Sequence, residues 1–158
     1  MKNRNLVHSD NWATPPRFYQ KLDEKYQFDF DPCPYNDTGK LAFNGLNIDW
    51  GKMNFINPPY SQKLKDAFVK KAIEETKKGN SSLMLLPVST STKLFHDWIK
   101  PNCDNIEFVK GRIKFIGINT KGHYVNWDQW ERQAPAGVIH VKNSGMHDSM
   151  LVLFRGNK

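Results

Sequence analysis

The sequence predicts an α/β protein with a mostly parallel sheet and a C-terminal antiparallel hairpin. In the first two thirds of the chain, strand-like apolar runs alternate with helical patterns across short connections, which is typical of parallel sheets. In the last third, strand-like runs are separated by turns and no helical pattern intervenes, which favours antiparallel pairing at the sheet edge. These runs lie at 112–117, 136–141 and 149–154.

The first helix is expected to follow Thr14, with this residue as its N-cap and Pro15 in the first helical position. Phe18, Leu22 and Tyr26 recur every four residues and form one apolar stripe. The stripe predicts that this helix packs on one face of the sheet.

Two short strands are expected to end at prolines, because proline donates no backbone hydrogen bond to a ladder. The strand at 28–31 ends with Asp31, and the strand at 52–57 ends with Asn57. Open α/β sheets bind ligands outside the carboxyl ends of their strands. These two polar side chains are therefore candidates for one site.

The remaining elements before the hairpin are expected at 62–78, 81–88, 91–100 and 105–110. The first of these is a helix bounded by Ser61 as its cap and by Gly79 at its end. The next is a continuous apolar run, typical of a strand covered on both faces. A short helix, expected to end at Pro101, and another strand follow.

The composition predicts one globular domain spanning 1–158, with 1–11 as a candidate flexible segment. Of the 158 residues 39% are hydrophobic and 25% charged, which excludes a disordered chain. No apolar run approaches the roughly 20 residues of a membrane helix, and the N-terminus lacks a signal-peptide core. The two cysteines, Cys33 and Cys103, provide no disulfide framework and no zinc spacing. We therefore expect a cytoplasmic protein with no membrane partner and no metal.

The formal net charge of +7 favours a polyanionic partner, most simply nucleic acid, although solubility alone is an alternative explanation. Segment 110–142 holds six basic and two acidic residues, together with interleaved aromatics. This pattern suits phosphate contact with base stacking, while the alternative is an aromatic cluster that packs the hairpin. Residues 117–135 are a candidate DNA-contacting insertion. The candidate contacts are Arg112, Lys114, Lys121, Tyr124, Trp127, Trp130 and Arg132.

The stretch "NPPY", Asn57–Tyr60, carries groups that can activate an exocyclic amine of a nucleic-acid base. Such an amine is a poor nucleophile because its lone pair is delocalised into the ring. The Asn57 oxygen and the Pro58 carbonyl can accept its hydrogens, and Tyr60 can stack on a flipped base. Pro58 and Pro59 would hold these groups rigid. The alternative is a turn that only ends the strand.

"NPPY" resembles the catalytic motif of S-adenosylmethionine-dependent amino-methyltransferases, especially those that make N6-methyladenine in DNA. Related motifs occur in enzymes that modify RNA guanine and protein glutamine. Three further features agree in order and spacing: "WATPP" at 12–16, "DPCP" at 31–34, and Asp49 eight residues before Asn57. The whole pattern is similar to the compact adenine methyltransferases of bacteriophages and prophages, often called the phage Dam family. It covers residues 10–116 well and the C-terminal strands loosely.

The resemblance implies a reduced Rossmann-like methyltransferase fold, S-adenosylmethionine as cofactor and double-stranded DNA as substrate, methylated at specific sites or non-specifically. It implies that Thr14 contacts the cofactor's methionine carboxylate and that Asp49 contacts its adenine. Catalysis would fall to Asn57, Pro58, Pro59 and Tyr60. The cofactor would contact Trp12, Thr14, Pro15, Asp31, Pro32, Cys33 and Asp49.

One departure from the pattern concerns the cofactor half. Asp31 and Asn57 are only 26 positions apart, which is fewer than the full helix-strand-helix unit of the family's cofactor-binding half requires. No acidic residue stands where a contact to the cofactor's ribose is expected, and Asn44 or Asn47 is the candidate for that place. The alternatives are the same chemistry on RNA adenine or guanine or on protein glutamine, and an inactive DNA-binding protein of the same fold.

Overall fold

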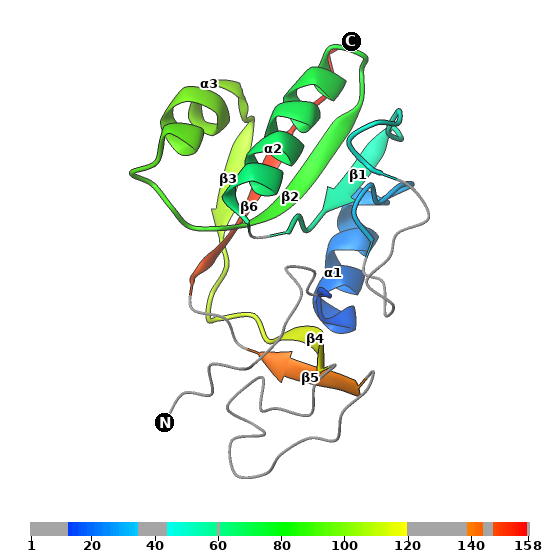
Figure 1. Cartoon of the computed structure of the whole chain (residues 1–158). Helices are drawn as coiled ribbons and strands as arrows, with labels where there is room; N and C mark the ends of the chain where they lie inside the picture. The colour runs from blue at the N-terminus through cyan, green and yellow to red at the C-terminus, as the bar shows by residue number, and fades with distance from the viewer. Residues whose placement is uncertain (1–12, 35–43, 60, 120–138, 144–146, 158) are drawn as a thin grey trace.

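The computed structural model describes residues 13–34, 44–59, 61–119, 139–143 and 147–157 (Figure 1). Its main sheet has four strands, β1 (Met53–Ile56), β2 (Ser81–Pro87), β3 (Asn105–Phe108) and β6 (Ser149–Phe154). Their order across the sheet is β1-β2-β6-β3. β1 and β2 are parallel, and β6 runs antiparallel to both of its neighbours.

The strand expected at 28–31 is reduced to a short parallel bridge beside β1. Phe30 pairs with Asn54, the Asp29 N–H donates to the Met53 carbonyl at 2.9 Å, and the Phe55 N–H donates to the Phe30 carbonyl at 3.1 Å. The two segments are therefore neighbours, and because they run parallel, both leave the sheet at the same edge.

The prediction of a mostly parallel sheet is not confirmed, because the sheet is mixed. The chain leaves β3 at its carboxyl end and returns into β6 from that same edge. The Val88 N–H, just beyond β2, donates to the carbonyl of Asp148, just before β6, at 2.8 Å. Because β6 enters the sheet at the edge where β2 and β3 end, it runs antiparallel to both of them.

The predicted antiparallel hairpin is present, but it does not extend the main sheet. β4 (Phe115–Asn119) and β5 (Ile139–Asn143) pair with each other as a separate two-stranded sheet, drawn below the main sheet in Figure 1. Most of the candidate insertion at 117–135 lies outside the described residues, as does the candidate flexible segment 1–11.

Within the described ranges, four helical elements accompany the sheet: α1 (Pro16–Tyr26), α2 (Gln62–Thr76), the π-helix η1 (Leu94–Ile99) and the short α3 (Lys100–Asn102). None of the helices in the described ranges is long and apolar enough to cross a membrane. The predicted start of α2 is confirmed, since Ser61 precedes it, but the helix ends at Thr76, two residues earlier than expected, and Gly79, with a φ of 85°, follows in the closing turn. Ser61 makes no side-chain capping bond. Pro101 lies inside α3 and does not end the helical segment as expected.

The prediction that Thr14 caps the first helix is wrong by one residue. α1 begins at Pro16, and Pro15 holds the cap position with an extended ψ of 136°. Because a proline disfavours the helical conformation of the residue before it, Pro16 keeps Pro15 out of the helix. The Thr14 hydroxyl is thereby left for another partner.

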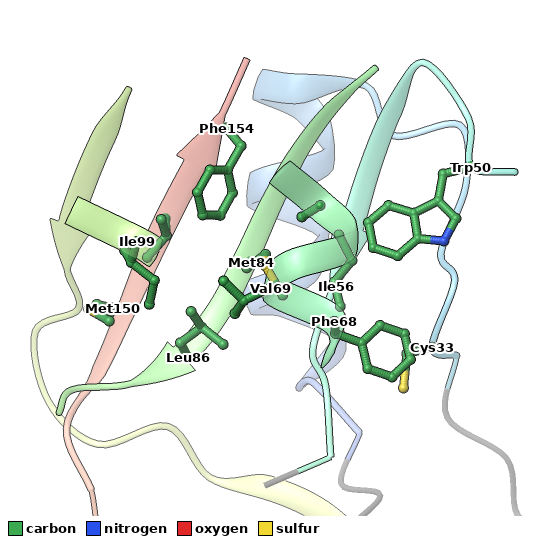
Figure 2. Packing of buried hydrophobic residues seen from close by; sticks show 12 residues of the cluster. Cys33, Trp50, Ile56, Phe68, Val69, Met84, Leu86, Ile99, Met150 and Phe154 are labelled. Atoms are coloured by element: carbon green, nitrogen blue, oxygen red, sulfur yellow. The ribbon is translucent and has the colours of Figure 1, made fainter. Parts of the chain in front are cut away.

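The core is divided between the two faces of the sheet. On one face Ile56, Met84, Leu86 and Val152 pack with α2 and η1 (Figure 2). On the other face the alternate strand residues pack with α1 and with the start of the hairpin. The strand residues are Phe55, Leu83, Leu85, Leu151 and Leu153, and the start of the hairpin contributes Ile113 and Phe115. The predicted apolar stripe of α1 is confirmed, since its three residues all belong to this second cluster.

Candidate active site at the carboxyl edge of the sheet

A small cavity of about 140 Å³ lies where the segments 13–19, 31–33 and 55–57 meet. Each of the three motifs noted in the sequence, "WATPP", "DPCP" and "NPPY", contributes at least one residue to its wall. Its lining residues are Ala13, Thr14, Tyr19, Asp31, Cys33, Phe55 and Asn57. The expectation that Asp31 and Asn57 converge at one edge is therefore confirmed, and Thr14 joins them.

Asn57 is buried and its amide is oriented by Thr14. The Asn57 Nδ2 donates to the Thr14 Oγ1 at 3.2 Å. This bond fixes the nitrogen end of the amide toward Thr14, so the other end of the side chain, Oδ1, is its acceptor. Pro58 is buried and Pro59 is half-buried, which holds the turn after β1 against the protein.

The Asp31 side chain accepts a hydrogen bond from the backbone of its own loop. Its Oδ1 accepts the Cys33 N–H at 2.8 Å, as in the turns that aspartate commonly stabilises. Burial raises the pKa of Asp31 to about 6, although the hydrogen bond from Cys33 acts in the opposite direction. No ion pair to Asp31 occurs within the described parts of the chain, so its negative charge lacks a neutralising partner there.

Cys33 is a small buried residue in the cavity wall and not a nucleophile. Burial, and after it the charge of Asp31, raises the pKa of its thiol to about 12, so the thiolate is not available near neutral pH. Gly45 lies directly against the carbonyl of Pro32, where a Cβ would overlap the oxygen. Close backbone approach therefore shapes this wall.

Tyr19 also lines the cavity, although its place in the sequence did not predict a site residue. Its ring packs edge-on against Phe55, with centroids 5.1 Å apart. Burial, then the charges of Asp23 and Asp31, raises the pKa of the Tyr19 hydroxyl, which therefore stays protonated. The available signal was its place one turn after Pro15, whose carbonyl accepts the Tyr19 N–H at 3.0 Å.

The loop 44–51 is held in place by Trp50. The indole Nε1 donates to the Gly45 carbonyl at 2.8 Å, and the Trp50 ring stacks on Phe68 of α2 (Figure 2). The Trp50 backbone N–H donates to the Glu75 Oε1 at 3.2 Å. This loop is thereby tied to α2 and, through Gly45, to the turn that carries Asp31.

Glu75 is a fully buried carboxylate that was not predicted from the sequence. It also accepts the Asn80 Nδ2 at 2.9 Å and forms ion pairs with Lys78 at 3.0 Å and Lys71 at 3.4 Å. Burial acts to raise its pKa, but the hydrogen bonds and lysine charges outweigh burial and lower the pKa overall. The sequence signal was its spacing, because Glu75 continues the buried positions 68 and 72 along one helix face.

Asp49 is not brought to the cavity. Its exposed carboxylate pairs with Lys78 at 3.1 Å, beyond the end of α2 and beside the amino ends of β1 and β2. Asn44 and Asn47 are also exposed, and the Asn44 Oδ1 accepts the Leu46 N–H at 3.0 Å. The buried neighbour Trp50 accounts for the conformation of this loop.

Of the candidate DNA contacts, Arg112 and Lys114 are described, and both are exposed at the start of the hairpin. The Arg112 Nε lies 3.5 Å from the Asp148 Oδ1, and the intervening Ile113 points into the core. No group of residues able to hold a metal occurs within the described ranges. The described ranges do not include the candidate cofactor contact Trp12 or the candidate catalytic residue Tyr60. They also do not include the candidate DNA contacts Lys121, Tyr124, Trp127, Trp130 and Arg132.

A carboxylate and an amide at the carboxyl ends of adjacent parallel segments are typical of α/β proteins that bind a ligand at that sheet edge, and they make this cavity the candidate site. The sequence model of the family described as "DNA N-6-adenine-methyltransferase (Dam)" matches residues 3–156, and the chain belongs to this family. The predicted membership in the phage Dam family is thus confirmed.

The chain is also similar to the DNA N-6-adenine-methyltransferase of Escherichia phage T1. The two are 33% identical over 135 residues, which cover 70% of this chain and 56% of the phage T1 protein. The chain therefore spans little more than half the length of this curated relative.

Proposed function

We propose that the chain is an S-adenosylmethionine-dependent methyltransferase that modifies the N6 amine of adenine in double-stranded DNA. The observation that carries the proposal is the convergence of Thr14, Asp31 and Asn57 on one cavity in a chain of the Dam family. These residues belong to the three motifs that the family resemblance assigned to cofactor and catalysis.

Asn57 and Pro58 act on the adenine amine as hydrogen-bond acceptors. The Asn57 Oδ1 and the Pro58 carbonyl take the two amine hydrogens, so the nitrogen lone pair is localised for attack. Because the Asn57 amide is already oriented by Thr14, this acceptor needs little reorganisation during the reaction. The surplus proton leaves the nitrogen after the methyl group is bound, so no side chain of strongly shifted pKa is required as a base. Tyr60 stacks on the flipped adenine.

The cavity fits the charged end of S-adenosylmethionine, which when bound supplies a methyl group on a sulfonium centre. Asp31 offers a carboxylate without an ion-pair partner in the described chain, suited to a cationic group of the cofactor. The Thr14 hydroxyl faces the same space, and Cys33 is small enough for close approach. Asp49 does not face this cavity, so its proposed contact with the cofactor's adenine has no support from the geometry.

Incubation with labelled S-adenosylmethionine and separate DNA, RNA and glutamine-peptide substrates tests the proposal. We expect label in duplex DNA, at N6-methyladenine after digestion to nucleosides. Label in RNA or peptide alone would assign the substrate to one of the alternatives. Cofactor titration by calorimetry separates an inactive protein, because a chain that binds DNA but gives no signal with S-adenosylmethionine is not a methyltransferase.

A further inference from the structure

A second and larger hollow, of about 540 Å³, lies between α2 and η1 above the end of β2. Its size is within the range of about 300–1,000 Å³ typical of small-molecule sites. The lining residues are Gln62, Lys65, Asp66, Lys70, Leu86, Pro87, Ser89, Thr92, Lys93, Leu94, Asp97, Trp98, Ile99 and Met150. We call this hollow the α2–η1 groove.

The groove opens at the same sheet edge as the candidate active site. Gln62 begins α2 only three residues after Pro59, and Pro87 ends β2, the strand paired in parallel with β1. Asn57 directly follows β1. DNA bound with its target adenine at Asn57 would therefore pass this groove.

An apolar floor and an aromatic wall make the groove suitable for a base. Leu86 and Met150 form the buried floor, and Trp98 is 39% exposed in the wall. The Lys70 Nζ lies 4.7 Å from the centroid of the Trp98 ring. π-Helical turns such as η1 frequently occur at functional sites.

The polar lining carries three lysines and two aspartates, so its balance favours an anionic ligand. Lys65 and Lys93 are the cations that can meet a phosphate, because Lys70 already lies over Trp98. Ser89 and Thr92 add hydroxyl groups from the loop after β2.

Asp66 contributes a hydrogen-bond acceptor that has no donor within the described part of the protein. Its Oδ1 is buried and has no hydrogen-bond partner among the residues that the structure describes. A buried acceptor without a partner lowers the stability of the folded protein, and a hydrogen-bond donor from a bound ligand would remove this cost. Aspartate accepts hydrogen bonds from exocyclic amines of bases, such as the N4 amine of cytosine. Thymine alone among the DNA bases lacks such an amine.

We propose that the α2–η1 groove binds one nucleotide that flanks the target adenine and discriminates against thymine at that position. Its base lies on the floor beside Trp98, its amine donates to the Asp66 carboxylate, whose side chain turns to present an oxygen to the groove, and Lys65 and Lys93 contact its phosphate. The inference rests on the proposed function, since it takes DNA as the substrate, and it adds a determinant of sequence preference.

The test uses the full chain and a pool of duplexes that hold one adenine in randomised flanks. Methylated duplexes are sequenced. The wild-type protein should disfavour thymine at one flanking position by about five- to hundredfold. Asp66→Ala should remove this discrimination, Asp66→Asn should keep much of it because the amide retains an acceptor, and the matched control Glu74→Ala, on the exposed face of the same helix, should not change it.

Thermal unfolding shows that the variants fold and adds an independent readout. Removal of a buried, unsatisfied acceptor should leave the Tm of Asp66→Ala equal to or about 2–4 °C above that of the wild type. The pair Lys65→Ala and Lys93→Ala should raise the KM for DNA with any flank, whereas Lys63→Ala and Lys77→Ala should not.

Failure of this inference is distinct from failure of the proposed function. If the wild-type protein methylates DNA but tolerates thymine at every flanking position, or if Asp66→Ala keeps the discrimination, the groove does not read a base. If no nucleic acid is methylated at all, the proposed function itself fails. Loss of cofactor affinity in Asp66→Ala, with DNA affinity unchanged, would assign the groove to another ligand and overturn the inference.

Discussion

The amide of Asn57 donates a hydrogen bond of 3.2 Å to the hydroxyl of Thr14, 43 positions earlier in the chain. The threonine of "WATPP" therefore contacts the proposed catalytic motif directly, in addition to the cofactor role that the family resemblance implies for it. This contact sets the direction in which the Asn57 carbonyl oxygen points.

Thr14→Val should lower kcat for methyl transfer about five- to hundredfold, since it removes a hydrogen bond worth about 1–3 kcal/mol to a buried group. Thr14→Ser keeps a hydroxyl and should restore most of the activity. Steady-state kinetics with DNA, at saturating cofactor, measure the effect. A kcat of Thr14→Val equal to that of the wild type would show that Asn57 does not depend on this contact.

Asn57→Ala should abolish methyl transfer and largely spare cofactor binding, because the side chain is proposed to act on the adenine amine. Transfer of labelled methyl groups and calorimetric titration with S-adenosylmethionine measure the two properties separately. A fully active Asn57→Ala protein would refute the catalytic assignment.

The convergence of Asp31 and Asn57 could be predicted because prolines mark where their segments end. Parallel neighbours bring their carboxyl ends to one edge, and the continuous burial of positions 54–56 and 82–87, covered on both faces, follows from their apolar runs. The place of β6 could not be predicted in the same way. Its six residues are all buried, like those of an interior strand, but an apolar run does not reveal which strands cover it.

The loop before β1 shows a second limit of prediction from the sequence. A spacing of eight residues relates Asp49 to Asn57 along the chain, but the direction of a loop side chain depends on its neighbours. Here Trp50 and Glu75 bind the loop to α2 and leave Asp49 in solvent with Lys78. A buried carboxylate on a helix is found only when its position is compared with the apolar face of that helix.

Cofactor affinity should increase as the pH rises through about 6, the raised pKa of Asp31, because a cationic group binds the ionised carboxylate. Below that pH the affinity should fall up to tenfold per pH unit. Asp31→Asn should weaken binding and remove this dependence. Calorimetric titrations between pH 5 and about 8 measure it, and an equal pH dependence in both proteins would exclude Asp31 as its origin.

The same group should make the free protein less stable as the pH rises from the unfolded to the folded pKa of Asp31. Because the folded protein holds this proton more tightly, the unfolding free energy should fall by on the order of 2–3 kcal/mol between pH 3.8 and about 6. Asp31→Asn lacks this contribution. Urea unfolding across this pH range, with both proteins, isolates the difference, and identical slopes would contradict the assignment.

Glu75→Ala should destabilise the protein by about 3–5 kcal/mol, since it leaves the Trp50 N–H and Asn80 without their acceptor in a buried place. Because the pKa of Glu75 is lowered in the folded protein, its contribution is present above the unfolded pKa and lost as the pH falls through the folded one. Urea unfolding at neutral pH measures the loss. Glu74→Ala, its exposed neighbour, should change the stability by less than about 0.5 kcal/mol.

The basic start of the hairpin should contribute to DNA affinity through phosphates. Arg112→Ala, Lys114→Ala and Lys121→Ala in one chain should weaken binding to duplex DNA and lower the slope of log K against log salt by about 0.9 for each phosphate contact removed. Fluorescence anisotropy at several salt concentrations measures the slope. The control Lys21→Ala/Lys63→Ala/Lys77→Ala removes the same charge from exposed helix positions and from the end of α2. If both triple variants lower the slope equally, net charge alone explains the effect; if the hairpin variant leaves it unchanged, this segment packs the fold and does not contact DNA.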